Sequence, residues 1–552
     1  MSMITEHEPT VPAGRATDKQ LALEDAPLLQ NSAAQWLEEF QGKNFKGKNL
    51  EDKKELQGTD KTLKVTTWIK ICTWFTPYRQ LFAFALSVNL VIAALGLSNS
   101  WMWSLQKLVP LLVGNILLAS FVRSEWVLRF IYWLAVKTFR PKIFPLSFRA
   151  KVVGLLYHIG GLHSGCGLSA LLWQTVASYN YFRRANMYNI GFLMTLGICQ
   201  ACLLVTCLSA FPVIRGPFHK YVGLIRNDAS VCGMVSLGQD NGGLSWTGIL
   251  STILSVILGS LWDVEHQRWD STPSRLISQI ELWFLLAIFV IIVLSWVTVT
   301  KVPVTVGTVE FGQPTDKVSV IRFPGGLTSG LHTRISLGGL REWHIFGTIS
   351  EGKHAECHYV VAAVQGEFTR SLNVEKPLNL YTKQWKPCGL PYFSRLFARG
   401  LAMCTGSGIG AVASTCLQHE GWFLVWIGPD LEKTYGKELV QLIYDKIPPS
   451  RRLIWDTRGP AGRPDVVKLL QDLHNYWEAE VTLFIGNPEM NANILRSCKA
   501  LKIPAFVSLI LHTAFFLDMM SLPGFNLGRM IVVRHSGSSN NYGNDFYLSR
   551  NL

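Results

Sequence analysis

Residues 402–413 read Ala-Met-Cys-Thr-Gly-Ser-Gly-Ile-Gly-Ala-Val-Ala, and this stretch decides the fold of the 552-residue chain. It follows a short run typical of a strand, opens a helix of small residues and precedes the apolar run 422–428. Glycines at such a strand-to-helix turn let backbone N–H groups approach a pyrophosphate at the helix N-terminus. The pattern therefore predicts a dinucleotide-binding unit in the second half of the chain.

The hydrophobic period changes on either side of this turn. After residue 401, expected strands at 423–427, 452–456 and 481–485 alternate with expected helices at 433–446, 464–477 and 489–500. This alternation predicts a parallel α/β sheet. Before the turn, residues 302–311 and 318–323 alternate as strands, and more short strands follow to about residue 366, which predicts an antiparallel β-barrel.

The chain as a whole has the composition of a membrane protein. Apolar residues make up 49% of the chain and charged residues only 16%, with 19 Trp. The net charge of +14 comes largely from Lys and Arg near apolar runs, so the positive-inside rule explains it better than nucleic-acid binding does. We expect the lipid bilayer, and no nucleic acid, as a partner. Six apolar runs predict a polytopic helical bundle: 81–97, 108–122, 152–177, 190–211, 247–261 and 282–299.

The orientation of the bundle follows from its flanks. Residues 124–136 mix charges with aromatic residues and are expected at the membrane interface, as is the aromatic run 68–75. Five basic residues in one expected loop, Lys137, Arg140, Lys142, Arg149 and Lys151, predict a cytosolic loop. With six spans, both termini are then cytosolic, although Arg183 and Arg184 fall on the far side and count against this topology.

A barrel followed by an α/β nucleotide domain resembles the ferredoxin–NADP reductase superfamily, whose barrel holds FAD and whose second domain holds NAD(P). Residues 342–350, Glu-Trp-His-Ile-Phe-Gly-Thr-Ile-Ser, resemble the flavin-binding His-Pro-Phe-Thr/Ser motif of its membrane branch. The resemblance implies FAD contacts from His344 and Phe346, and a hydroxyl from Thr348 or Ser350 near the isoalloxazine. Arg334 is the expected partner of the FAD pyrophosphate. The alternative for His344 is a barrel histidine with a structural role.

The same resemblance implies which residues bind the nicotinamide dinucleotide. The turn formed by Gly406, Gly408 and Gly410 corresponds to the superfamily's Gly-Thr-Gly-Ile-Ala/Gly turn, and the turn with Gly486 and Met490 corresponds to its late Cys-Gly-x-x-x-Met turn. Arg458 ends the third expected strand, where NADP-dependent relatives bind the 2′-phosphate. It favours NADPH, with NADH as the alternative and a solvated loop arginine as the structural reading. Cys404 is a candidate catalytic residue facing the nicotinamide, or a packed cysteine.

A narrower resemblance rests on residues 325–334, 342–344, 364–369 and 432–436 and covers roughly 310–506. These strings resemble the fungal TmpA-type integral membrane flavoproteins, and the same block ends some adenylate-forming, peptide-synthetase-like proteins. The resemblance implies a multi-pass membrane oxidoreductase that passes electrons from NAD(P)H through FAD to a small-molecule acceptor, in development-linked signalling or specialised metabolism. It places the protein in the plasma membrane or another endomembrane.

The resemblance also divides the chain. We expect a polar, largely disordered cytosolic tail (1–78), a transmembrane helical domain (79–300), an FAD-binding barrel (301–398), an NAD(P)-binding α/β domain (399–506) and an atypical C-terminal tail (507–552). Residues 221–246 and those after Phe506 depart from the family pattern, and one hypothesis is that they are alternative coding sequence such as retained introns.

Two other functions stay open. A haem-linked transmembrane reductase of ferric iron or oxygen would need axial histidines, and the candidates are His158, His163 and His219. His158 and His163 are five residues apart, about 140° around a helix, so they cannot form one axial pair and haem is not expected. Gly160, Gly161 and Gly165 offer close helix packing as the alternative explanation of this segment. The other function is a catalytically silent membrane sensor or scaffold.

Overall fold

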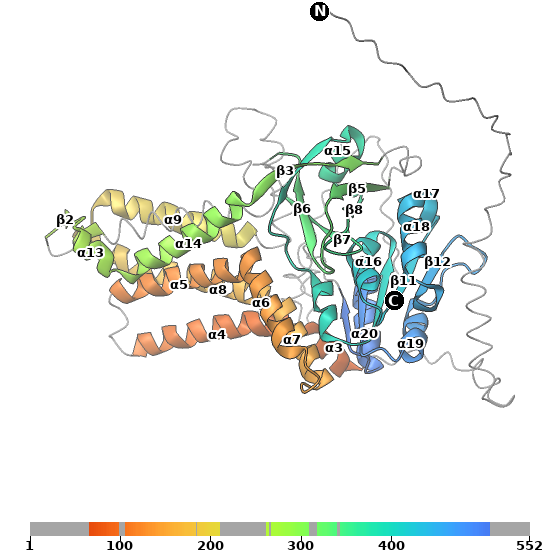
Figure 1. Cartoon of the computed structure of the whole chain (residues 1–552). Helices are drawn as coiled ribbons and strands as arrows, with labels where there is room; N and C mark the ends of the chain where they lie inside the picture. The colour runs from red at the N-terminus through yellow and green to blue at the C-terminus, as the bar shows by residue number, and fades with distance from the viewer. Residues whose placement is uncertain are drawn as a thin grey trace, which may run out of the picture.

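The computed structural model describes residues 66–98, 105–183, 185–209, 261–263, 266–307, 317–338 and 343–507. Residues 1–65 of the expected tail 1–78, the segment 221–246, most of the run 247–261, His219 and residues 508–552 lie outside this description. The end of the expected disordered tail is helical, because α3 spans Thr67–Trp74 and α4 begins at Pro77. Figure 1 shows the helical bundle on one side and the two β-containing domains on the other. The helices before the barrel are α3 (Thr67–Trp74), α4 (Pro77–Ser98), α5 (Leu105–Arg123), α6 (Glu125–Phe139), α7 (Leu146–Tyr157), α8 (Gly160–Arg183), η2 (Ala185–Met187), α9 (Ile190–Ser209), α13 (Pro273–Ser278) and α14 (Ile280–Val297).

Three helices in the described part of the chain are long and apolar enough to cross a membrane, within α4, α9 and α14. A fourth span results if α5 and α6, which meet at a bend of 66°, are counted as one. These three spans correspond to the expected runs 81–97, 190–211 and 282–299, and the expected run 247–261 lies mostly outside the described residues. One face of α6 packs on the barrel side, where the Tyr132 ring lies 4.4 Å from the Phe393 ring of the η5 segment (Leu390–Leu396).

The prediction of one span over 152–177 was wrong, because the chain breaks between α7 and α8 at His158 and Ile159. Two consecutive glycines follow the break, and glycine has a low helix propensity. They also allow α8 to approach α4: a Cβ on Gly161 would lie 2.2 Å from Tyr78 O, and one on Gly165 would lie 2.8 Å from Phe82 O. The close packing expected for this glycine segment is confirmed at these two positions.

The predicted basic loop is also corrected. Lys137 lies in α6, and Arg149 and Lys151 lie in α7, so only the short turn between these helices is a loop. The buried Arg149 side chain donates to Leu396 O and lies 3.6 Å from Glu480 of the second β domain. Arg149 therefore links α7 to the β domains, while the turn itself is exposed, with Ile143 84% exposed.

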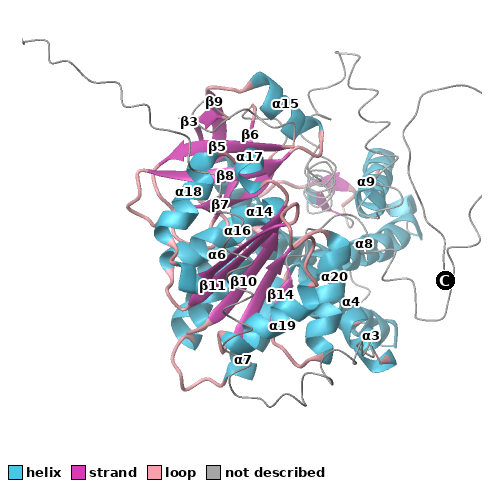
Figure 2. Ribbon diagram, turned by 90° about the vertical axis from the view of Figure 1, so that its right-hand side faces the viewer, coloured by secondary structure: helices cyan, strands magenta, loops and turns pink. Residues whose placement is uncertain are grey.

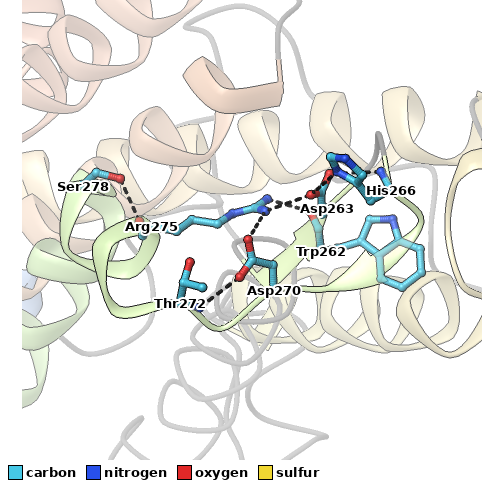
Figure 3. A network of polar contacts seen from close by, with 7 residues as sticks. All are labelled: Trp262, Asp263, His266, Asp270, Thr272, Arg275 and Ser278. Carbon is cyan, nitrogen blue, oxygen red and sulfur yellow. Dashed lines mark hydrogen bonds and ion pairs between the residues drawn. The ribbon is translucent and has the colours of Figure 1, made fainter.

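At the end of the bundle far from the barrel, β1 (Trp262–Asp263) and β2 (Arg268–Trp269) form a small antiparallel hairpin (Figure 1). Figure 3 shows Arg275 between two carboxylates of this hairpin, with Nη1 3.3 Å from Asp270 and 3.6 Å from Asp263. Arg275 Nη2 also donates to Trp262 O at 3.1 Å. These bonds fasten the hairpin to α13 just before the apolar α14.

The barrel is a seven-stranded antiparallel sheet of order β3-β9-β6-β7-β8-β5-β4. Its edge strands β3 and β4 are consecutive in the chain and separated only by Val304, so a single bent segment joins both edges and nearly closes the sheet. The expected single strand 302–311 is thus a bend between two strands, with residues 308–316 outside the description. The strands are β3 (Val299–Pro303), β4 (Thr305–Val306), β5 (Val318–Pro324), β6 (His332–Ser336), β7 (His344–Ile349), β8 (Cys357–Ala363) and β9 (Asn379–Lys383), with α15 (Glu367–Glu375) before β9.

The buried His358 in β8 predicts acid sensitivity of the barrel. Its ring stacks on Phe323 at 5.2 Å, Nδ1 contacts Gly325 O at 2.6 Å, and burial lowers its pKa from 6.5 to about 4. Above pH 6.5 the His358 ring is neutral in both the folded and the unfolded state, so its titration does not change the free energy of unfolding. As the pH falls from 6.5 towards 4, only the unfolded state takes up the proton, and stability falls by up to about 3 kcal/mol.

The check is the difference in melting temperature between about pH 7 and pH 5 for the wild type and for His358→Gln, since Gln keeps a donor but cannot titrate. The variant should lose less stability on acidification than the wild type. Equal losses in both proteins would contradict the assignment.

The second β domain is a five-stranded parallel sheet of order β12-β11-β10-β13-β14. Figure 2 shows this sheet between helices, with α19 and α20 along one side. Alternation along β10 sends Ala402 and Cys404 into the core with α16 and α18, and Leu401 and Met403 into the core with α19 and α20. The elements are β10 (Gly400–Thr405), η6 (Gly406–Gly408), α16 (Ile409–Gln418), β11 (Trp422–Gly428), α17 (Leu431–Tyr435), α18 (Lys437–Lys446), η7 (Pro449–Arg451), β12 (Arg452–Asp456), α19 (Val466–Tyr476), β13 (Val481–Ile485), α20 (Pro488–Ala500) and β14 (Ala505–Val507).

The strand order reverses direction between β10 and β13. The chain adds β11 and β12 on one side of β10, and then crosses to add β13 and β14 on the other. In open α/β sheets, ligands bind outside the carboxyl ends of the strands at such a switch point. The end of β10 is the Gly-rich turn, so the predicted dinucleotide turn lies at this position.

Candidate nucleotide and flavin sites

The turn after β10 is shaped by glycines. Gly406 has φ +57°, a conformation that side chains rarely adopt, and its carbonyl accepts a 3.0 Å bond from Trp426 Nε1. A Cβ on Gly408 would lie 2.8 Å from Ile485 O at the end of β13. The end of β13 therefore lies directly against the turn that starts α16, with Gly406, Ser407 and Gly408 half-buried.

The late turn lies beside the Gly-rich turn on the β13 side, where a Cβ on Gly486 would be 3.0 Å from Thr405 Oγ1. Gly486 N donates to Asn491 Oδ1 at 3.0 Å, and the Asn487 side chain caps α20 by accepting from Met490 N at 2.8 Å. Gly406, Gly408 and Gly486 thus lie together at the switch point, with Met490 in the first turn of α20. Gly410 lies elsewhere, facing the barrel, where a Cβ would be 3.3 Å from Val361 Cβ.

The barrel and the parallel sheet meet at a close backbone contact. A Cβ on Gly347 of β7 would lie 2.5 Å from Ala411 Cα and 2.7 Å from Ala411 N, in the first turns of α16. Ser414 Oγ, also on α16, donates to Thr348 O at 2.6 Å and accepts from Ser350 N at 2.9 Å. The helix that begins at the Gly-rich turn is therefore bonded directly to the strand that carries the predicted flavin motif.

The hydroxyls of this motif already have partners in the barrel. Thr348 Oγ1 donates to Leu331 O at 2.6 Å, and Ser350 Oγ accepts from Leu327 N at 2.9 Å. Both residues are buried. The structure gives each hydroxyl a structural bond, and a contact to the isoalloxazine stays a prediction.

His344 and Phe346 share one face of β7, because alternate residues of a strand point to the same side. On that face the His344 ring stacks on Phe368 of α15 at 4.0 Å, and the Phe346 ring lies 6.5 Å from it. Phe368 entered the sequence analysis only within the family string 364–369. It is 4% exposed and packs with Ile321 and Ile335, so this face of β7 points into the barrel core.

Arg334 lies on the other face of the barrel sheet. It pairs with Ile345 across β6 and β7, whereas Phe346 pairs with Thr333, so Arg334 points away from the His344 face. Its guanidinium forms an ion pair with Glu125 of α6, and Lys383 Nζ lies 3.9 Å from the same carboxylate. The structure therefore places Arg334 at the junction of bundle and barrel and not with the other predicted FAD residues.

Cys404 is fully buried within β10. Its Sγ donates to Val425 O at 3.6 Å, and burial raises the pKa of the thiol well above its usual range. A thiol in this state is a poor nucleophile, which favours the packed-cysteine interpretation. Arg458 follows β12 and is exposed, and its guanidinium pairs with Asp430 at the end of β11.

The two described haem candidates are not arranged as an axial pair. His158 Nδ1 contacts Gly154 O of its own helix at 2.7 Å, and His163 Nδ1 contacts Ala119 O of α5 at 3.0 Å. His219 lies outside the described residues. Within the described ranges, no group of three or more His, Cys, Asp or Glu side chains is arranged to hold a metal ion.

These features define a class: an antiparallel barrel joined to a doubly wound α/β domain with a glycine turn at the switch point. Residues 390–510 match the family model for the C-terminal domain of adenylate-forming reductase 03009. Adenylate-forming reductase 06235 of Coprinopsis cinerea is 26% identical to this chain over 450 residues, and adenylate-forming reductase 03009 of the same fungus is 24% identical to it over 436 residues. Each alignment covers 78% of this chain but only 40% of the relative, so the chain spans about two fifths of these relatives' length.

A solved structure, phthalate dioxygenase reductase, aligns with 38% of this chain and 67% of its own, at 8% identity and a TM-score of 0.30. An alignment at this level supports no argument about fold or function. The assignment of the fold rests on the strand order and register described above.

Proposed function

We propose that the chain is a membrane-anchored oxidoreductase that takes electrons from a nicotinamide dinucleotide to FAD and on to a small-molecule acceptor. One observation carries the proposal: the flavin-motif strand β7 and the nucleotide-turn helix α16 are in backbone contact at Gly347 and Ala411. Hydride transfer requires two bound groups within a few ångströms, and this contact joins the two elements that would hold them. The two Coprinopsis cinerea relatives are named reductases, which agrees with this class of reaction.

The residues at the switch point fit a dinucleotide. The Gly408 position has no room for a side chain, because a Cβ would lie 2.8 Å from Ile485 O, and the helix start therefore presents backbone at the switch point. The amide groups there would hold the pyrophosphate, and Gly486 would let the nicotinamide approach β13. When bound, the dinucleotide supplies the hydride and the flavin accepts it.

The resemblance assigns flavin contacts to His344 and Phe346 of β7. Both rings pack on Phe368, which is 4% exposed in the barrel core, so the flavin would contact the parts of His344 and Phe346 that this packing leaves half-buried. Arg334 is not part of this proposal, since its guanidinium is bonded to Glu125 on the opposite face.

The membrane part of the proposal rests on α4, α9 and α14 as spans. The short helix α3 adds support, because Trp68, Ile71 and Phe75 are 71%, 40% and 43% exposed at a helical spacing just before α4. In this arrangement the barrel and the parallel sheet lie in the cytosol, as the TmpA-type flavoproteins imply. The acceptor would be a small molecule reached from the flavin.

Turnover of the protein in detergent tests the proposal. Purified with added FAD, it should retain flavin and reduce ferricyanide when a nicotinamide dinucleotide is supplied. Flavin retention without turnover would instead support the silent scaffold, and a Soret band lost in His158→Ala would support the haem-linked reductase.

His344→Ala should weaken FAD binding by roughly tenfold, because it removes one ring of the stack with Phe368. The measurement is the dissociation constant of FAD by quenching of flavin fluorescence. The matched control is His354→Ala, an exposed histidine on the turn before β8, which should bind FAD like the wild type. Equal FAD affinity in both variants would remove His344 from the site.

A further inference from the structure

Three side chains meet beyond the carboxyl ends of β11 and β12. Asp430 N donates to Asp456 Oδ1 at 3.2 Å, and Arg458 N donates to the same oxygen at 2.8 Å. The Arg458 guanidinium is paired with the Asp430 carboxylate, whose side chain is 33% exposed. The Asp456 carboxylate thus accepts hydrogen bonds from both loops, and the Asp430 carboxylate is left partly exposed beside Arg458.

The backbone of Asp430 is held on both sides. Its N–H is bonded to Asp456, and its carbonyl accepts from Thr434 N at 2.8 Å in the first turn of α17. Its φ is +44°, in the left-handed region where Asp and Asn are enriched among non-glycine residues. The carboxylate is therefore presented from a fixed position.

This position has a defined relation to the Gly-rich turn. β11 is the neighbour of β10 and pairs with it in parallel, so the ends of both strands lie on the same edge. A dinucleotide whose pyrophosphate lies at the first turn extends its adenosine ribose over the end of the second strand. An acidic residue about 20 residues after the turn binds the ribose hydroxyls there, and Asp430 follows Gly408 by 22 residues (430 − 408).

We propose that Asp430 is a specificity-determining residue that selects the dinucleotide without a 2′-phosphate, NADH over NADPH. The inference rests on the proposed function and names the electron donor. It reverses the expectation from Arg458 alone: that guanidinium is bound to Asp430 and serves to orient the carboxylate rather than to receive a phosphate.

The charges at this position explain the selection. A 2′-phosphate carries a charge of about −1.5 to −2 and would have to displace Asp430 from Arg458, after which it would lie against the freed carboxylate. A ribose 2′-hydroxyl would instead donate to that carboxylate and leave the Arg458 pair in place. The repulsion from Asp430 therefore weakens the binding of NADPH and leaves the binding of NADH unchanged.

The test is the ratio of dissociation constants for NAD⁺ and NADP⁺, measured by calorimetry on the full-length protein in detergent with FAD bound. The wild type should bind NAD⁺ at least about tenfold more tightly. In Asp430→Asn, which keeps the backbone preference but loses the charge, the ratio should approach one or invert. The matched control is Asp445→Asn on α18, an exposed carboxylate that accepts only a local bond from Gln441, and it should keep the wild-type ratio.

Two results would overturn the inference: tighter binding of NADP⁺ by the wild type, or an unchanged ratio in Asp430→Asn. A separate assay of oxidation of both reduced dinucleotides distinguishes this failure from failure of the proposed function. If neither is oxidised, the oxidoreductase proposal fails, while the two dissociation constants still decide whether Asp430 selects.

Discussion

Gly347→Val should abolish electron transfer from the nicotinamide to the flavin, with a loss of at least about hundredfold in the rate of flavin reduction. A Cβ at this position would lie within 2.7 Å of Ala411 Cα, Ala411 N and Gly410 C, and all three are backbone atoms that no side-chain rotation can move aside. The barrel and α16 would have to separate. A displacement of about 1 Å between reacting groups can cost a factor of a hundred in rate.

The separation should leave each cofactor site in place, so FAD content and nicotinamide affinity serve as internal controls. Gly154→Val is the matched substitution, because a Cβ on Gly154 in α7 would meet nothing within 4 Å. Flavin reduction at the wild-type rate in Gly347→Val would mean that this contact does not align the two sites.

Gly408→Val should weaken use of the nicotinamide dinucleotide without affecting the flavin. The added side chain would either push β10 away from Ile485 O, 2.8 Å from the new Cβ, or fill space that the dinucleotide would occupy at the switch point. Either change removes interactions of the turn with the dinucleotide, so kcat/KM for the dinucleotide should fall by roughly tenfold to a hundredfold. Gly154→Val again provides the control.

Steady-state kinetics and the flavin content of the purified variant check this prediction together. Loss of flavin along with nicotinamide use would indicate general unfolding rather than a blocked dinucleotide site. Unchanged kcat/KM would place the dinucleotide elsewhere.

The parallel sheet could be predicted closely from the sequence. The expected strands 452–456 and 481–485 have the observed bounds of β12 and β13, and the expected 423–427 lies within β11. The central strands β11 and β13 are buried along their whole length, as expected for central parallel strands. The edge strand β12 buries only Leu453–Trp455. The expected helix 433–446 is interrupted at Gly436, whose φ of +86° ends α17 and begins α18.

The bundle was harder to predict because hydropathy does not report where a helix breaks. The run 152–177 has no Asp, Glu, Lys or Arg, yet it divides before Gly160, where α8 must pack against the backbone of α4. The broken segment is set by contacts between helices that are far apart in the sequence.

The candidate site was predictable where its geometry is local. His344 and Phe346 are two residues apart and therefore share a face of β7, and Gly406 and Gly408 belong to one turn. Arg334 and Arg458 could not be placed in this way, because their partners Glu125 and Asp430 are brought to them by the fold. A basic residue in the sequence predicts an anionic partner, but only the fold shows whether that partner is a ligand phosphate or a carboxylate of the same chain.

The central claim is that a nicotinamide dinucleotide reduces a flavin held within this chain. The most direct measurement is the visible absorbance of the FAD-loaded protein before and after anaerobic addition of NADH. The account predicts that NADH bleaches the visible absorbance bands of the flavin within the time of one catalytic turnover. A bound flavin that dithionite bleaches, but that neither NADH nor NADPH changes, would contradict it.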